Sequence, residues 1–238
     1  MAPLNDITIY DLFNDLNLSE QEKTEFAHET KFVCELFHFN MNNYKPPHTA
    51  RICLNVALSE QPLVPSFFGS ICHSSHYFNK DKYFNLDKNG KYKFLLNYIY
   101  GATMKLAAEL NWNKDVFIDT YNRAKQMNFV FKVEFPAKFS PDRQKKGQAI
   151  LERTEERSIL TLHIFGSNID EKTLLFDKMN TYPLDVSERI AKQCKWIDND
   201  KFGFQDRKSK LTIHYNCSRK KRFRNMKFWE EKYEPLRT

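Results

Sequence analysis

The sequence predicts an α+β fold, with antiparallel sheet or sheets, a central helix pair and short N-terminal helices. Two observations predict it. Segments with alternating apolar residues are followed by two consecutive stretches with helical spacing, and alternating segments then return. A doubly wound fold would instead alternate strand and helix along the whole chain. We therefore expect strands on either side of one helix pair.

The first 40 residues predict two short helices and a strand. Residues 8–18 have apolar positions at helical spacing. Ser19 and Glu22 fit the S-x-x-E pattern of a capping box, which opens a second helix to about His28. Apolar residues recur in the pattern of a strand over residues 32–39, which lead into a loop.

Two more strands are expected next, over residues 51–58 and 66–73, with a turn marked by Pro62 and Pro65. Short consecutive strands of this kind predict an antiparallel meander. The polar residues 80–91 could separate a first lobe from the rest of the chain.

Residues 89–110 predict the clearest helix, because their apolar side chains recur at i, i+3, i+4 and i+7. The chain breaks at residues 111–113, and a second helix follows over residues 114–128. A connection this short predicts two adjacent, roughly antiparallel helices.

Strands and one further helix are expected in the remainder of the chain. The predicted strands cover residues 129–135, 147–153, 158–165 and 174–179, the helix covers 185–194, and a final hairpin covers 196–204 and 211–215. We expect a single α+β domain over residues 1–216, with possible lobes at 1–80 and 90–216. A basic and aromatic C-terminal tail follows at 217–238.

Composition predicts a folded protein of the cytoplasm. Hydrophobic residues make up 41% of the 238 residues and charged residues 28%, which is far from the composition of disordered chains. We find no apolar run of the roughly 20 residues that span a membrane and no secretory signal, so no membrane association is expected. Five scattered cysteines, an odd number, predict reduced thiols: Cys34, Cys53, Cys72, Cys194 and Cys217.

Positive charge is concentrated at the C-terminal end. The net charge is +7, and residues 207–238 hold 11 Lys/Arg and 3 Glu, so the other 206 residues together carry −1. Cations interleaved with aromatic residues are what single-stranded nucleic acid binding uses. A solvated face is the plainer interpretation. The candidate nucleic-acid-binding residues are Arg219, Lys220, Lys221, Arg222, Arg224, Lys227 and Trp229.

The densest cluster of possible metal ligands is Cys72-His73-Ser-Ser-His76. Strand alternation would place Cys72 and His76 on one face and His73 on the other, and a tetrahedral zinc site needs a second ligand pair that the sequence does not supply. The same alternation separates Cys72 from His73 as a catalytic pair. We therefore predict no metal site and no cofactor.

His163 and His214 stand in near-identical strand segments, Leu-Thr-Leu-His and Leu-Thr-Ile-His. Two-histidine phosphoesterases have a hydroxyl residue two positions after each histidine, whereas this chain has Phe165 and Asn216. The glycine-rich phosphate-binding motifs and the nucleophile elbow are also missing from the sequence. No catalytic residue can be assigned. An enzyme whose site assembles from scattered residues stays open, but we expect binding rather than catalysis.

One resemblance bears on the partner. Four features carry it: the helix pair of residues 91–128, Asn-Phe-Val-Phe-Lys at 128–132, Ser-Pro-Asp-Arg at 140–143 and Lys-Trp-Ile-Asp-Asn at 195–199. In these features, residues 88–196 are similar to uncharacterised bacterial α+β proteins. Those proteins accompany polymorphic toxins as immunity partners. The resemblance implies a cytoplasmic protein that binds and blocks another protein.

Two functions are therefore expected from the sequence. The first is a non-enzymatic protein-binding protein, in one version an immunity-type inhibitor of a toxin. If that toxin cleaves nucleic acid, the acidic residues at 152–156 and 170–171 are the candidates to face its basic site. The alternative is an RNA- or DNA-binding accessory protein that uses the basic C-terminal segment.

Overall fold

The computed structural model describes residues 4, 6–60, 62–180, 187–206 and 211–225. Helices and sheets coexist in the chain, so the expected α+β class is confirmed. The chain divides into two compact units, Met1–Phe129 and Val130–Thr238. The sequence placed a possible lobe break at 80–90, where the structure has a short helix and the start of a long one.

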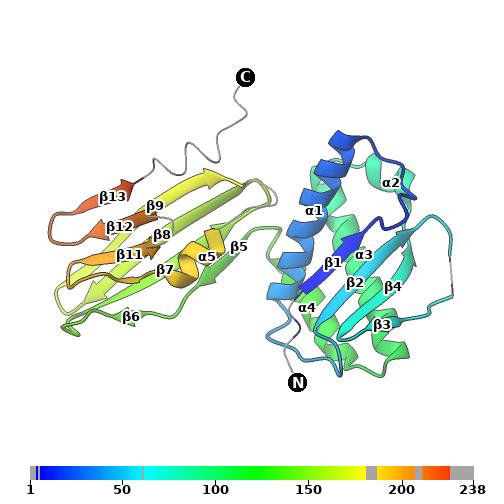
Figure 1. Ribbon diagram of the computed structural model, residues 1–238, viewed down its shortest axis with the longest axis horizontal. Coiled ribbons are helices and arrows are strands. Elements are labelled where there is room, and N and C mark those ends of the chain that lie inside the picture. Colours follow the sequence, from blue (N-terminus) through cyan, green and yellow to red (C-terminus); the bar gives the residue numbers. More distant parts are fainter. Residues whose placement is uncertain (1–3, 5, 61, 181–186, 207–210, 226–238) are drawn as a thin grey trace. The chain divides into compact units, whose positions relative to one another are not determined.

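The N-terminal unit contains a four-stranded sheet in the order β1-β2-β4-β3, together with four helices (Figure 1). The elements, in chain order, are β1 (Asp6–Tyr10), α1 (Glu20–Phe39), β2 (Arg51–Ala57), β3 (Ser66–Phe68), β4 (Ile71–Tyr77), α2 (Lys80–Phe84), α3 (Lys88–Glu109) and α4 (Lys114–Gln126).

The helix expected over residues 8–18 is wrong, because the chain forms β1 and then turns. Ile7 and Ile9 are buried and alternate with more exposed neighbours, which is the pattern of a strand with one face in the core. β-Branched side chains also favour extended backbone. Asn14 and Asn17 have φ of 56° and 44°, which are incompatible with a helix continuing through them.

The strand expected over residues 32–39 is also wrong, because α1 continues to Phe39. The capping box is confirmed, since Ser19 accepts from the backbone N–H of Glu22 and the Glu22 side chain accepts from the backbone N–H of Ser19. Phe26, Val33 and Phe37 recur at intervals of seven and four residues and are buried, which is helical spacing. Over so short a window, the apolar residues of 32–39 fit the two-residue period of a strand as well as the 3.6-residue period of a helix.

The antiparallel meander is wrong for the same reason. Since α1 carries the chain back across the sheet, β1 pairs with β2 in parallel. β2 also pairs with β4 in parallel, and the chain connects these two strands through β3. The strand expected at 66–73 is instead a hairpin of β3 and β4, which pair antiparallel around Gly69 with φ of 58°.

The helix pair is confirmed as α3 and α4, which lie in the N-terminal unit. Asp87 and Asn113 cap their N-termini by accepting backbone N–H groups, and Asn111 has a positive φ of 53° in the connection between the two helices. In the described part of the chain, no helix is long and apolar enough to cross a membrane.

The C-terminal unit is built from two antiparallel sheets and a short helix (Figure 1). One sheet has the order β5-β7-β8-β9, with β6 also paired to β7, and the other has the order β10-β11-β12-β13. The elements are β5 (Phe131–Glu134), β6 (Lys138–Phe139), β7 (Lys145–Arg153), β8 (Arg157–Gly166), β9 (Ile169–Met179), α5 (Ser187–Gln193), β10 (Lys195–Trp196), β11 (Lys201–Asp206), β12 (Leu211–Asn216) and β13 (Lys221–Asn225).

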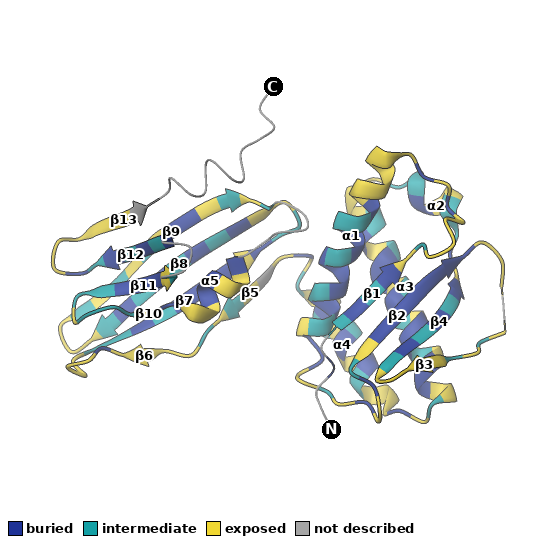
Figure 2. Ribbon diagram, in the orientation of Figure 1, coloured by how far each residue is buried: buried dark blue, intermediate teal, exposed yellow. Residues whose placement is uncertain are grey.

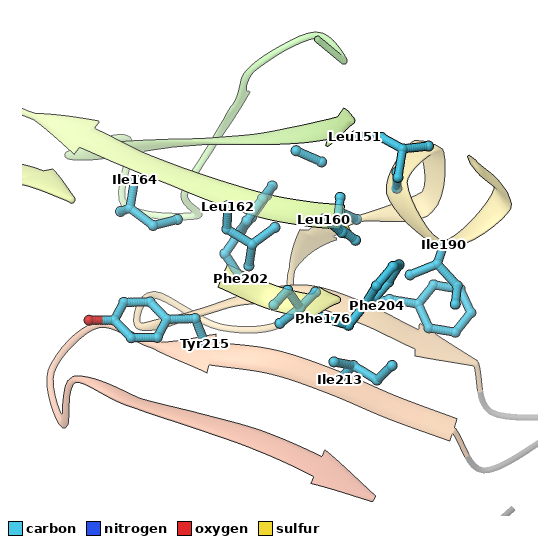
Figure 3. Packing of buried hydrophobic residues seen from close by; sticks show 14 of the residues in the cluster. Leu151, Leu160, Leu162, Ile164, Phe176, Ile190, Phe202, Phe204, Ile213 and Tyr215 are labelled. Carbon is cyan, nitrogen blue, oxygen red and sulfur yellow. The ribbon is translucent and has the colours of Figure 1, made fainter. Parts of the chain in front are cut away.

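A single apolar cluster joins the two sheets of this unit. Leu160 and Leu162 of β8 face Phe202 and Phe204 of β11, and Ile190 of α5 closes one side of the cluster (Figure 3). Alternate residues of β8 and β12 are buried, which is the pattern expected of strands with one face in a core. Burial of this cluster is what fixes the register of both sheets.

The expected C-terminal tail begins as ordered structure. Residues 217–220 form the turn after β12, and Lys221–Asn225 form β13, an edge strand paired antiparallel with β12. Residues 217–225 of the expected tail are therefore a turn and a strand, and the residues from 226 onward lie outside the described part of the chain. Sequence period alone did not reveal β13, because its charged residues do not alternate with apolar ones.

Candidate binding surfaces

Helices cover only one face of the sheet in the N-terminal unit. Ile52, Leu54 and Val56 of β2 point toward the helices and are fully buried. Figure 1 shows α3 and α4 behind this sheet, and no described element of the unit in front of it. Sheets with parallel strands normally have both faces covered. The face without helices, which we call the uncovered face, is therefore the first candidate binding surface, although Cys53 and Asn55 at its centre are buried by neighbouring side chains.

The uncovered face has a polar centre. Register places Thr8, Cys53 and His73 in one row across β1, β2 and β4. At the amino end of the strands, Arg51 lies 3.4 Å from the carboxylate of Asp6. A pocket of about 190 Å³ opens on this face, lined by Tyr10, Leu12, Arg51, Cys53, Asn55, Ile71 and His73.

Asn55 anchors the segment that follows β1 to this face. Its Oδ1 accepts a hydrogen bond of 2.9 Å from the backbone N–H of Leu12, and its Nδ2 donates one of 3.2 Å to Ser75. Because β1, β2 and β4 are parallel, their carboxyl ends meet at one edge of the sheet. The chain segments leaving these strands therefore lie close to one another.

Large apolar side chains are exposed at this edge. We call Tyr10, Leu12, Phe13, Leu58 and Tyr77 the carboxyl-edge patch. Leu12 and Phe13 are 66% and 69% exposed, and the side chains of Tyr10, Leu58 and Tyr77 are exposed as well. In Figure 2 the interior of β2 is buried while the segments beyond the strand ends are exposed. Grouped exposed apolar side chains are typical of protein interaction sites.

The charges beside the carboxyl-edge patch are two carboxylates and one ammonium group, that of Lys80, which donates to the carbonyl of Leu16. Asp11 and Asp15 belong to the same segment as Leu12 and Phe13, and the carboxylate of Asp11 accepts the backbone N–H groups of Asp15 and Leu16. Arg51 stands at the opposite end of the strands, where it is paired with Asp6. Both cations near the patch already have partners within the chain, Arg51 with Asp6 and Lys80 with Leu16, so a basic rim on a protein partner is favoured there.

The structure separates the Cys72-His73-Ser-Ser-His76 cluster as alternation predicts. Cys72 and His76 point to the buried side of β4 and His73 to the uncovered face. Ser74 Oγ lies 2.8 Å from His76 Nε2, and burial lowers the pKa of His76 to about 4. Among the described residues, no group of three or more His, Cys, Asp or Glu could hold a metal ion.

None of the five cysteines has the lowered thiol pKa that is typical of a nucleophile. Burial raises the pKa of Cys72 and Cys217 to about 11 and of Cys194 to about 12, and it also raises the pKa values of Cys34 and Cys53. All five are buried free thiols, which remain protonated near neutral pH.

The two candidate histidines do not converge. His163 lies on the outer face of β8, where its Nε2 is 2.6 Å from Asp170 Oδ1. His214 lies on β12 in the other sheet, stacked on Phe223 at 5.1 Å between ring centres. Each side chain points away from the apolar cluster that separates the two sheets. A two-histidine site is therefore not formed.

The predicted nucleic-acid-binding residues occupy the turn after β12 and strand β13. Lys220 pairs with Glu171 at 3.0 Å, and Arg222 donates to the carbonyl of Leu174 at 2.9 Å, so both fasten β13 to β9. Arg219 and Lys221 are exposed on the same segment. The backbone of Arg224 pairs with that of Ile213, whereas Lys227 and Trp229 lie outside the described residues.

The acidic residues proposed to face a basic partner are largely engaged within the chain. Asp170 contacts His163, and Glu171 accepts hydrogen bonds from Tyr215 and Lys220, which lower its pKa. Glu155 and Glu156, in the turn between β7 and β8, also have interactions of their own.

Sequence reasoning missed the carboxyl-edge patch, because it assigned residues 8–18 to a helix. The signal was present in Asp6–Tyr10, where isoleucines alternate with Thr8 and Tyr10.

The chain was compared with known protein families, curated proteins and solved structures, and none of them matches it.

Proposed function

We propose that this chain is a non-enzymatic binding protein whose N-terminal unit docks a folded protein partner on the carboxyl-edge patch and the adjoining uncovered face of its sheet. The observation that carries the proposal is the exposure of Leu12 and Phe13 beside an uncovered, partly parallel sheet. A stable partner would cover that face, as a second layer of helices does in other parallel sheets.

The partner's chemistry follows from the patch. An apolar centre calls for an apolar partner surface, and Asp11 and Asp15 call for Lys or Arg at its rim. In the immunity-type version of the proposal, those cations belong to a toxin that cleaves nucleic acid. Asp11 and Asp15 then replace the acidic residues at 152–156 and 170–171 as the groups that face the toxin.

The test starts with a photo-crosslinking amino acid placed at Leu12, with Met179 as the matched control. Met179 is an equally exposed apolar residue, at 65%, but belongs to the C-terminal unit. The protein captured at position 12 and not at 179 is then purified and recombined with this chain. We expect a stoichiometric complex by light scattering, and its loss with the double variant Leu12→Asp, Phe13→Asp.

Three results would contradict the proposal. The complex could survive unchanged in the double variant, or the Met179→Asp control could weaken it equally. Alternatively, crosslinks at position 12 could join only two copies of this chain, which would make the occupant a second copy. Because Leu12 and Phe13 are exposed, their replacement should change the free energy of unfolding by no more than about 0.5 kcal/mol.

A second candidate function is nucleic-acid binding by the segment around β13. Arg219, Lys221 and Phe223 are all exposed there, which favours phosphate neutralisation together with stacking. Truncation at Asn216 is a poor test, since it would delete an edge strand. Charge reversal by Arg219→Glu with Lys221→Glu is cleaner, and we expect it to weaken binding of a single-stranded oligonucleotide and flatten its salt dependence.

The matched control for that experiment is Lys132→Glu, an exposed reversal on the five-stranded sheet. Equal binding by both variants and the unmodified chain would remove the second candidate.

A further inference from the structure

A second, larger pocket lies on the outer face of the five-stranded sheet, at the end where β7 begins and β8 ends. Its volume is about 500 Å³, which is the size of pockets that hold small organic groups. The side chains that matter here are Phe139, Arg143, Lys146, His163, Phe165 and Ser167.

The strand register arranges this pocket as a platform. Phe139 of β6 pairs with Lys146 of β7, Lys146 pairs with Phe165 of β8, and Phe165 pairs with Asp170 of β9. Residues directly paired on adjacent strands point to the same face of a sheet. Two phenylalanine rings therefore flank one lysine in a single row across the sheet.

Side-chain contacts hold the platform in place. Lys146 Nζ lies 4.7 Å from the centre of the Phe139 ring, and the His163 and Phe165 rings are also 4.7 Å apart. Asp170 bonds the His163 ring and fixes its orientation. Phe139 is nevertheless 58% exposed, so part of its ring remains accessible to a ligand even though Lys146 lies over it.

The charges at the pocket are three cations, Arg143, Lys145 and Lys146, and one carboxylate, Asp170, which is bonded to His163. Lys145 Nζ lies 2.9 Å from the carboxylate of Asp200 and also donates a hydrogen bond to the carbonyl of Asn199. The cations that face a ligand are therefore Arg143 and Lys146. Arg143 lines the pocket and has a φ of 60°, an uncommon conformation for a residue other than glycine.

The basic turn before β13 lies at the same end of the C-terminal unit. Lys220 contacts Glu171, the residue after Asp170, and the backbone N–H of Cys217 donates to the carbonyl of Asp200, which holds Lys145. Because consecutive side chains of a strand point to opposite faces, Lys220 lies on the side of β9 that faces the second sheet, whereas Asp170 and the pocket lie on the outer side. The basic turn and the pocket are therefore two separate positive surfaces of the same unit.

We propose that this pocket holds an unpaired base of single-stranded nucleic acid, stacked on Phe139 and bordered by Phe165, with the flanking phosphates at Arg143 and Lys146. Sheets that present aromatic residues on their outer face recognise unpaired bases in this way, because every base offers a flat π-surface to stack. The assignment rests on the second candidate function and supplies it with a base-binding site; it is independent of the protein-binding proposal.

The test uses fluorescently labelled ten-nucleotide single strands of RNA and DNA, titrated with the full chain at several salt concentrations. Phe139→Ala should weaken binding about 5- to 150-fold, the range of one lost base stack, whereas Phe139→Tyr should retain it. Lys146→Glu should weaken binding of all sequences and lower the salt slope by about 1. Met179→Ala, an exposed apolar residue on the same sheet, is the control.

The outcomes separate this site from the basic turn. If Arg219→Glu with Lys221→Glu abolishes binding but Phe139→Ala does not, the second candidate function survives and the pocket assignment is overturned. If no variant changes binding, or if no strand binds, both are overturned. Inorganic phosphate or ATP competing as well as the strand would reduce the pocket to a site for anions or free nucleotides, which also overturns the assignment.

Discussion

The hydroxyl of Tyr83 on α2 donates a hydrogen bond to the carboxylate of Glu29 on α1, inside the N-terminal unit. Lys91 of α3 approaches the other carboxylate oxygen at 3.4 Å, and its Nζ lies 5.3 Å from the centre of the Tyr83 ring. One buried carboxylate thereby connects three helices. Burial and the Glu29 contact raise the pKa of Tyr83, so the hydroxyl remains a donor.

Removing the Tyr83 hydroxyl should therefore destabilise the unit. Tyr83→Phe leaves a buried carboxylate oxygen short of a donor, which costs about 1–3 kcal/mol of the free energy of unfolding. Urea denaturation measures this change. Tyr77→Phe, which alters an exposed tyrosine, is the control and should stay within about 0.5 kcal/mol. Equal stabilities for both variants would show that the buried hydroxyl contributes nothing.

Stability should fall on mild acidification because of His76. Burial, with a smaller contribution from Lys105, lowers its pKa to about 4 in the folded chain, below the ordinary value of 6.5. As the pH drops from 6.5 to 4, the unfolded chain binds a proton that the folded chain does not. The folded state therefore loses stability across this window, by on the order of 3 kcal/mol.

Denaturation curves at pH 7, 6, 5 and 4 test this expectation. The variant His76→Asn should have a flatter dependence than the unmodified chain between pH 6.5 and 4. Its absolute stability is immaterial, because the comparison is between slopes. Carboxylates with lowered pKa values, such as those of Asp198 and Glu171, lose their contributions mainly at lower pH, and in both chains alike. Parallel slopes for the two chains would contradict the prediction.

Gly147 of β7 should not tolerate a side chain. A Cβ there would lie 2.6 Å from Cδ2 of Phe202, whose ring is buried in the cluster between the two sheets. Overpacking of this kind costs about 1–3 kcal/mol, so Gly147→Ala should lower the melting temperature. Gly101→Ala is the matched control, because a Cβ there meets nothing within 4 Å and alanine favours the helix by about 0.5–1 kcal/mol. A melting temperature unaffected by Gly147→Ala would show that the two sheets can separate locally.

Thiol labelling should distinguish Cys53 from the other four cysteines. All five are buried, but Cys53 alone lines a pocket on the uncovered face of the N-terminal sheet. We expect iodoacetamide to modify Cys53 first and the others only as the chain unfolds, with a rate that rises with pH because the thiolate is the nucleophile. Peptide mass spectrometry identifies the order, and prior modification of Cys194 or Cys217 would contradict it.

Periodicity along the chain was informative where one pattern extended over several turns or strand pairs. The helix pair α3 and α4, the capping box at Ser19 and most strands of the C-terminal unit follow from the sequence. Short segments were ambiguous. Residues 8–18 and 32–39 fit both a helical and an extended period, and exchanging the two assignments hid the parallel pairing of β1 with β2.

The sequence by itself determined the α+β class, the position of the helix pair α3 and α4 and the concentration of positive charge near the C-terminus. Tertiary structure alone decided which surfaces exist. The carboxyl-edge patch requires three strands to end at one edge, and the pocket of Phe139 and Phe165 requires a register across several strands. Local propensity encodes the first kind of fact, whereas contacts between residues distant in sequence form only when the whole core is buried.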